Sequence, residues 1–154
     1  MKELHFSMVI NAPLEKVWET LWNDDSYRKW TASFNPGSYM ESDWKVGGKT
    51  LFLDADRNGM VSTIQQLEPP KLVTFSHYGE LRQGVEDITS ERVKSTAGAI
   101  ERYELEPNGG GTLLKVTVQV PGEYEEMMNE GFTKGLEQLK DLSEQTENAV
   151  NTQP

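Results

Sequence analysis

His77 is the side chain of this sequence with the widest chemical scope. It precedes Tyr78 in a segment that we predict to be a central strand. An imidazole that faces a cavity can act as a general acid or base near neutral pH, or it can orient a polar group of a ligand. A histidine in a strand is more often only hydrogen-bonded within the protein. Both interpretations stay open, and no catalytic residue is assigned.

Carboxylates are common around this strand, but no spacing in the sequence brings two of them together. Paired carboxylates would support acid–base chemistry, whereas single ones on strands and loops usually face water. We therefore expect most of them to be solvated. The ones considered are Glu80, Glu86, Asp87, Glu91 and Glu101.

Three more specific chemistries are excluded by residue type or spacing. The sequence has no cysteine and only the histidines His5 and His77, too few ligands for a typical zinc site. No serine lies in a recognisable nucleophile context. Residues 47–50 resemble the end of a phosphate-binding loop, but Asp43 stands where the first glycine is needed, and a strand follows instead of a helix. We expect neither a metal ion nor a cofactor.

The elements that position these side chains begin with a strand and two helices. Residues 3–10 alternate between apolar and polar side chains, which predicts a half-buried strand. Apolar residues then recur at helical spacing over 13–22, and Asn11 is available to cap this helix. Asn23 can cap a second, shorter helix that ends near Trp30.

Six more strands follow and are separated by turn residues. Asn58-Gly59 predicts a hairpin, because these residue types readily adopt a positive φ. The glycine-rich segment 108–111 is a further turn, and the polar segment 82–98 fits a long loop with a short helix. The six strands are expected at 38–43, 48–55, 59–68, 71–80, 99–106 and 112–120.

A long helix closes the domain at residues 123–146. Its apolar residues recur on one face, and the glutamates of its first turn suit the positive end of the helix dipole. The polar residues 148–154 predict a disordered tail, so we expect a single domain at 1–147. The apolar face consists of Met128, Phe132, Leu136, Leu139 and Leu142.

This order of elements predicts the fold class. Sequential strands joined by turns form an antiparallel sheet, and the long amphipathic helix must bury its apolar face against that sheet. We therefore expect an α+β protein in which a strongly curved antiparallel sheet of about seven strands wraps around a long C-terminal helix. The expected order is one strand, two helices, six strands and one helix.

Composition narrows the class of function. The 154 residues fit one domain, and the net charge of −10 argues against a nucleic-acid surface and against stable attachment to anionic lipid. No apolar run approaches the ~20 residues of a membrane-spanning helix. The alternating N-terminus differs from a signal peptide. We therefore expect a cytoplasmic protein.

Several motifs, taken in order along the chain, resemble a known group of proteins. They are Ala12-Pro-Leu-Glu-Lys-Val-Trp18, Trp30, Val46-Gly47-Gly48, Asp56 to Gly59, Leu67-Glu-Pro-Pro-Lys-Leu-Val73, Glu104 and Gly131-Phe132. Their order and spacing resemble the SRPBCC or START-like superfamily, which shares its fold with the birch-pollen allergens. Within it, the chain is similar to the group related to the C-terminal domain of the heat-shock-protein-90 ATPase activator.

The resemblance implies a helix-grip fold, in which the C-terminal helix closes one side of a hydrophobic cavity. Relatives bind lipids, sterols, polyketides or other apolar molecules, and some are cyclases or hydratases. The chaperone activator carries a separate N-terminal domain, and this chain begins directly at its first predicted strand. A chaperone partner is therefore the less favoured expectation.

Aromatic residues and methionines are the candidates for the wall of this implied cavity. Each of them alone could equally fill a solid core, although methionine suits an adaptable surface. On the last helix, Gly131 and Gly135 lie one turn apart, and we expect close packing or room for a ligand at Gly131. The ten cavity positions, with His77 included, are Trp30, Phe34, Tyr39, Phe52, Met60, Phe75, His77, Tyr103, Met128 and Phe132.

The function that follows is binding of a small hydrophobic or amphipathic molecule in an internal cavity. His77, Tyr39 or Tyr103 would orient the polar part of that molecule. Two alternatives stay open. One is a cyclase- or hydratase-like enzyme, which needs a titratable group aimed into the cavity. The other is a protein-interaction module of the co-chaperone kind, which needs an exposed apolar patch.

Overall fold

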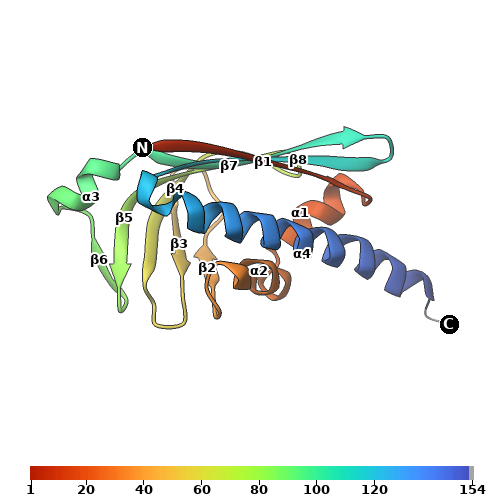
Figure 1. Ribbon diagram of the computed structural model, residues 1–154, viewed down its shortest axis with the longest axis horizontal. Coiled ribbons are helices and arrows are strands. Elements are labelled where there is room, and N and C mark those ends of the chain that lie inside the picture. The colour runs from red at the N-terminus through yellow and green to blue at the C-terminus, as the bar shows by residue number, and fades with distance from the viewer. Residues whose placement is uncertain (153–154) are drawn as a thin grey trace.

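A curved antiparallel sheet wraps around one side of a long helix (Figure 1). The structure is a computed structural model that describes the backbone of residues 1–152 and the side chains of residues 1–145. Within these residues the sheet has eight strands in the order β1-β8-β7-β5-β4-β3-β2, and β6 pairs with β5 beside this path. The strands are β1 (Lys2–Ile10), β2 (Tyr39–Ser42), β3 (Lys49–Leu53), β4 (Gly59–Glu68), β5 (Leu72–Arg82), β6 (Val85–Asp87), β7 (Ala99–Asn108) and β8 (Gly111–Val120).

The helices confirm the predicted helix-grip arrangement. Two short helices follow β1, and the long helix α4 follows the last strand. The α+β class is as predicted, but the sheet has eight strands instead of about seven. The helices are α1 (Leu14–Trp22), α2 (Asp24–Trp30), α3 (Glu91–Thr96) and α4 (Glu125–Thr152), with 3-10 turns η1 (Thr31–Ser33) and η2 (Gly122–Tyr124).

The extra strand lies in the segment 82–98, where the sequence predicts only a loop and a short helix. This segment contains both the strand β6 and the helix α3. Gln83 and Gly84 have positive φ angles of 51° and 82°, which is the backbone of a tight turn between β5 and β6. Glutamine rarely adopts this conformation, so the residue types do not indicate the hairpin.

The two caps predicted near the N-terminus have different outcomes. The side chain of Asn23 accepts a hydrogen bond from the backbone N–H of Asp25 (3.1 Å) and caps α2 as predicted. The cap predicted from Asn11 is wrong, because Pro13 is at the N-cap of α1 and no side chain caps this helix. Instead, the N–H of Asn11 donates to Oε2 of Glu144 (2.8 Å) and ties the end of β1 to α4.

The β3–β4 hairpin forms at the predicted place by different means. The positive φ falls on Arg57 (62°), not on Asn58 or Gly59. Asp54 closes the turn, because its Oδ1 accepts the backbone N–H of Asn58 (3.0 Å). Glycine is needed at position 59 for space, since a Cβ there would overlap the carbonyl oxygen of Phe52. The turn at 108–111 uses its glycines as predicted.

The core lies between the concave face of the sheet and α4. On α4, Phe132, Leu136 and Leu139 are buried, and Met128 and Leu142 at the ends of the same face are partly buried against the core. Burial of one large apolar side chain stabilises a fold by about 1.5–3 kcal/mol. The predicted apolar face is confirmed, and it holds α4 on the sheet.

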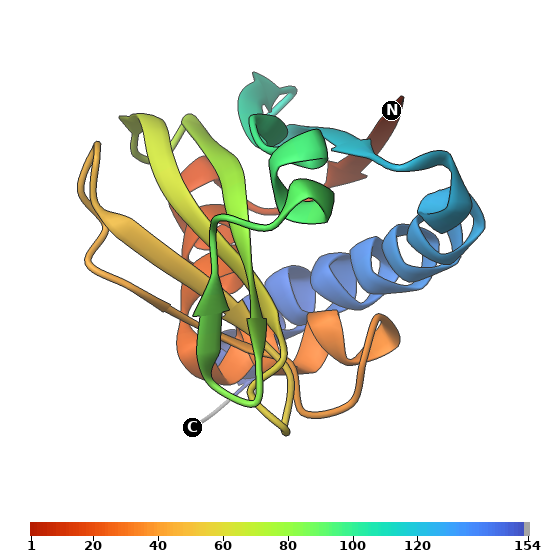
Figure 2. The same cartoon turned by 90° about the vertical axis from the view of Figure 1, so that its left-hand side faces the viewer.

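The long helix extends past its predicted end. It continues to Thr152, whereas the sequence predicts an end at residue 146. The predicted tail, 148–154, falls on residues whose side chains, and at 153–154 also the backbone, lie outside the described structure. The tail and the domain at 1–147 stay predictions. The start of α4 lies toward the same end of the molecule as α3 (Figure 1), and this end faces the viewer in Figure 2. None of the described helices combines the length and apolarity that crossing a membrane requires.

Candidate functional site

A cavity of about 830 Å³ lies between the sheet and the first turns of α4. Its walls come from α2, η1, the middle strands of the sheet, α3 and the start of α4. The exposed lining residues, among them Asn35, Arg92, Tyr124 and Met127, mark its mouth. The mouth therefore opens at the end of the molecule where α3 and η2 lie.

Eight of the ten predicted cavity positions line this space. They come from elements far apart in the sequence, and the curvature of the sheet brings them together. Whether they contact a ligand stays a prediction. The eight are Trp30, Phe34, Phe52, Met60, His77, Tyr103, Met128 and Phe132.

Tyr39 and Phe75 are described but do not belong to the lining. Phe75 is fully buried behind the wall, where the ring of Phe52 packs edge-on against it (5.0 Å between centroids). Tyr39 lies on the edge strand β2, and its hydroxyl accepts a hydrogen bond from Arg57 (2.9 Å). The guanidinium of Arg28 lies over its ring. Tyr39 is half-buried against a second apolar cluster formed by Leu53, Val61 and Leu81, and alternation along a four-residue strand cannot predict this position.

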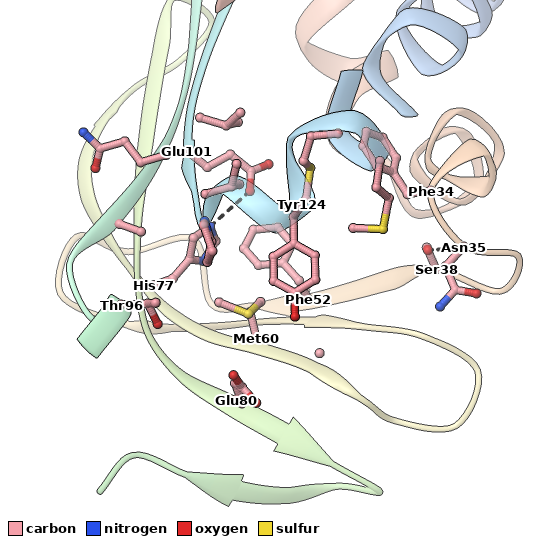
Figure 3. A pocket seen from close by; sticks show the side chains of 18 of the residues that line it. Phe34, Asn35, Ser38, Phe52, Met60, His77, Glu80, Thr96, Glu101 and Tyr124 are labelled. Atoms are coloured by element: carbon pink, nitrogen blue, oxygen red, sulfur yellow. Dashed lines mark hydrogen bonds and ion pairs between the residues drawn. The ribbon is translucent and has the colours of Figure 1, made fainter. Parts of the chain in front are cut away.

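Four polar side chains form a series of contacts at the cavity wall. His77 is central: its Nδ1 lies 2.5 Å from Oγ of Ser62, and its Nε2 lies 3.2 Å from Oε1 of Glu101. The hydroxyl of Tyr103 donates to the other oxygen of Glu101. Figure 3 shows His77 and Glu101 pointing toward each other inside the cavity. Their side chains are 11% and 20% exposed, so both reach the cavity without facing bulk water.

The partners of His77 fix the positions of its protons. A carboxylate only accepts hydrogen bonds, so the contact with Glu101 requires a hydrogen on Nε2. In the neutral imidazole, Nδ1 is then the acceptor, and the hydroxyl of Ser62 donates to it. Ser62 is fully buried and does not line the cavity. It therefore orients the imidazole from behind and is not placed to attack a ligand.

Two buried tyrosines flank the carboxylate. Burial, reinforced by the charge of Glu101, raises the pKa of Tyr103 and of Tyr27 well above the ordinary tyrosine value. Both phenols therefore keep their protons under physiological conditions. Tyr103 remains a hydrogen-bond donor to Glu101, and together with His77 it occupies one position on each carboxylate oxygen.

The strand register explains how Glu101 reaches this site. On β7, Glu101 alternates with Tyr103 and Leu105, which are both buried on the inner face. Strand β5 pairs His77 with Ala99, so Glu101 lies diagonally across from His77 on the same face. Glu101, whose side chain is 20% exposed, is an exception to the expectation that most of these carboxylates are solvated. The alternation of positions 101, 103 and 105 along β7 is the pattern in the sequence from which the inward position of Glu101 could have been predicted.

The other carboxylates considered from the sequence have separate roles. Glu80 also lines the cavity, and both of its oxygens lie 2.8 Å from Nη1 of Arg92. Glu86 forms an ion pair with a lysine at 2.8 Å. Backbone and side-chain hydrogen bonds at the start of α3 lower the pKa of Asp87. Glu91 is exposed, as predicted.

The two glycines of α4 allow this helix to pack closely against residues 30–34. A Cβ on Gly131 would overlap the ring of Phe34, and a Cβ on Gly135 would lie 2.9 Å from the carbonyl oxygen of Trp30. Both distances are too short for a real side chain. Close packing therefore explains Gly131, and it sets the position of Phe34 in the cavity wall.

The arrangement supports binding and proton movement more readily than metal chemistry. Among the described residues, no group of three histidine, aspartate or glutamate side chains is placed to hold a metal ion. The imidazole–carboxylate pair can accept a hydrogen bond from a polar ligand group or exchange a proton with it. The surrounding aromatic and methionine side chains can enclose an apolar body.

Comparison with known proteins identifies the family. The model of the family described as "Activator of Hsp90 ATPase homolog 1-like protein" matches residues 11–144. The chain belongs to this family. The resemblance to the SRPBCC superfamily that the sequence motifs indicate is thereby confirmed. No curated protein sequence matches the chain closely enough to be called similar.

Solved structures similar to this member of the family share its fold at low sequence identity. The Aha1 dimer from Colwellia psychrerythraea is 20% identical over 92% of this chain and 95% of its own, with a TM-score of 0.67. Protein MLL2253 from Mesorhizobium loti is 15% identical over 94% and 98%, with a TM-score of 0.69. DynU16, from the dynemicin biosynthetic locus, is 16% identical over 94% and 48%, with a TM-score of 0.68.

Proposed function

We propose that this protein binds a small hydrophobic or amphipathic molecule in the cavity between the sheet and the start of α4. The supporting observation is a space of about 830 Å³ whose lining contains many aromatic and aliphatic side chains and the polar pair of His77 and Glu101. Ligand sites in proteins are typically apolar hollows of roughly 300–1,000 Å³ with a few placed polar groups.

Apolar burial supplies the affinity in this proposal. At about 25 cal/mol per Å², a ligand that buries on the order of 200 Å² gains roughly 5 kcal/mol before the cost of association. Because millimolar binding corresponds to about 4 kcal/mol and micromolar binding to about 8 kcal/mol, contact with the walls alone gives an affinity no tighter than the submillimolar range. Hydrogen bonds from the polar pair add orientation more than affinity.

Native mass spectrometry of the protein purified from its own host tests the proposal. We expect the native spectrum to contain a noncovalently bound small molecule that is absent from the spectrum of the denatured protein. A neutral, environment-sensitive fluorescent dye provides a second measurement, because its emission increases when it leaves water. The proposal fails if no molecule co-purifies and the dye shows no saturable binding.

An enzyme of the cyclase or hydratase kind is the second candidate. The observation that favours it is the His77–Glu101 contact inside the cavity, because an imidazole held by a carboxylate can transfer protons. Once a co-purifying molecule is identified, incubation with the protein should change its structure. Substitution of His77 by glutamine should stop that change while binding continues. If the wild-type protein leaves the molecule unchanged, the protein is a binder only.

The description of the family raises a chaperone partner as a further alternative. A pull-down with the middle domain of Hsp90 tests this alternative directly. Retention of the protein at physiological salt would support a co-chaperone role. Absence of retention would leave small-molecule binding as the proposed function.

A further inference from the structure

We propose that the cavity selects amphipathic molecules whose polar end is a cation that donates hydrogen bonds, such as a protonated amine, over anionic molecules of the same length. The inference rests on the proposed function, because it names the class of ligand for the same cavity. It is carried by the charges of the lining residues and by the unused hydrogen-bonding capacity of Glu101.

Negative charge dominates the lining. Among the described residues that line the cavity, four carboxylates face a single guanidinium, that of Arg92. Arg92 is already paired with Glu80, which lies 2.8 Å away from it. An anionic head group would therefore meet carboxylates without a free cation to receive it, and like charges at such a site oppose binding.

Glu101 is the carboxylate placed inside the cavity. A carboxylate has about four acceptor positions, and Glu101 uses one on each oxygen, for His77 and for Tyr103. Two positions remain for a ligand. Protonation of His77 would not create a free cation, because its Nε2 already lies 3.2 Å from Glu101.

The other acidic lining residues lie near the mouth of the cavity, and they also favour a positively charged ligand. Asp54 belongs to the β3–β4 turn, where its oxygens accept hydrogen bonds from Asn58 and Asn35. Glu123 is exposed in η2. The aromatic rings of the wall, such as Phe34 and Tyr124, add faces that attract cations and not anions.

A matched series of three ligands tests the inference. Decylamine, decanol and decanoate share one chain and differ in the head group. Each would displace a neutral fluorescent dye at a pH of about 8, where the amine is cationic and the carboxylate anionic. We expect the amine to bind at least tenfold more tightly than decanoate, with decanol between them.

Two variants separate the cavity charge from the net charge of the protein. Glu101→Gln removes the carboxylate inside the cavity, and we expect it to reduce the preference for amine over decanol at least fivefold. Glu137→Gln removes the same charge from an exposed position of α4 outside the lining, and it should leave the preference unchanged. The series with wild-type protein remains decisive if Glu101→Gln does not fold.

Each outcome has one meaning. Equal binding of amine and decanoate, or tighter binding of decanoate, overturns the inference and leaves the proposed function intact. A preference for amine that survives Glu101→Gln overturns the role of Glu101. If neither the dye nor any of the three ligands binds, the proposed function itself fails.

Discussion

Nε2 of His77 lies 3.2 Å from Oε1 of Glu101, although the register of β5 and β7 pairs His77 with Ala99. The contact is diagonal, and it forms because both side chains lie on the concave face of the curved sheet. It places a proton-carrying pair in the wall of the cavity, next to aromatic and aliphatic side chains. Ser62 on one side and Tyr103 on the other complete the series of contacts, so the orientation of His77 depends on residues that do not all line the cavity.

Substitution of Ser62 by alanine should disturb His77. The change removes the donor to Nδ1 and leaves a largely buried nitrogen without its partner, which costs about 1–3 kcal/mol. We expect the free energy of unfolding to fall by this amount. In nitrogen-detected NMR spectra, the Nδ1 signal should shift because it loses its hydrogen bond, whereas the hydrogen should stay on Nε2, which still donates to Glu101.

Ser143 provides the control for Ser62. It is also fully buried, but its hydroxyl has no hydrogen-bond partner among the described residues. Ser143→Ala should therefore be neutral or slightly stabilising. Equal losses of stability for the two variants would contradict the role assigned to Ser62.

Local periodicity made much of this fold predictable. The alternation in β1 and the apolar face of α4 depend only on neighbours along the chain, and both agree with the structure. The site depends on register between strands. Glu101 meets His77 only because β5 and β7 pair across the intervening segment 82–98, and that pairing is invisible in a single sequence. Strand β6 could not be predicted either, because the turn before it needs a positive φ at Gln83, which glutamine rarely adopts.

Alanine substitutions at the two glycines of α4 should differ in their effects. Either alanine gains about 1 kcal/mol in helix propensity. At Gly135 the Cβ would meet the backbone oxygen of Trp30 at 2.9 Å, which cannot move cheaply. We expect a net loss of about 2 kcal/mol in the free energy of unfolding, within the range for overpacking.

At Gly131 the obstacle is the side chain of Phe34, which can move into the cavity. Gly131→Ala should therefore cost less stability than Gly135→Ala, but it should weaken binding of the neutral dye severalfold. Urea unfolding and dye titration of both variants give the two measurements. A larger stability loss at Gly131 would show that Phe34 is fixed in place.

Phe132→Trp should reduce ligand uptake. Phe132 lines the cavity and packs between Phe6 and Phe34, with ring centroids 4.7 and 4.8 Å away. A larger ring has no room behind it and must project into the cavity. We expect the affinity for the dye to fall at least threefold. Val9→Trp places the same side chain on an exposed position of β1 and should leave binding unchanged. Unchanged uptake by Phe132→Trp would exclude this residue as a wall of the binding space.

Glu144 should stabilise the protein in a pH-dependent manner. Its hydrogen bonds with Lys140 (2.5 Å) and with the backbone N–H of Asn11 (2.8 Å) lower its pKa below the ordinary glutamate value. A carboxyl group with a lower pKa in the folded state stabilises that state above its unfolded pKa of about 4.3, and this contribution is lost as the pH falls through the folded value.

Glu144→Gln should therefore lower the free energy of unfolding by about 1 kcal/mol at a pH of about 7. The difference from the wild type should shrink at a pH of about 3, because the wild-type carboxyl group is then increasingly protonated. Urea unfolding of both proteins at the two pH values measures the difference, and Glu137→Gln on the exposed face of α4 serves as the control. A difference that stays constant with pH would mean that Glu144 holds the end of β1 on α4 through its shape and not through its charge.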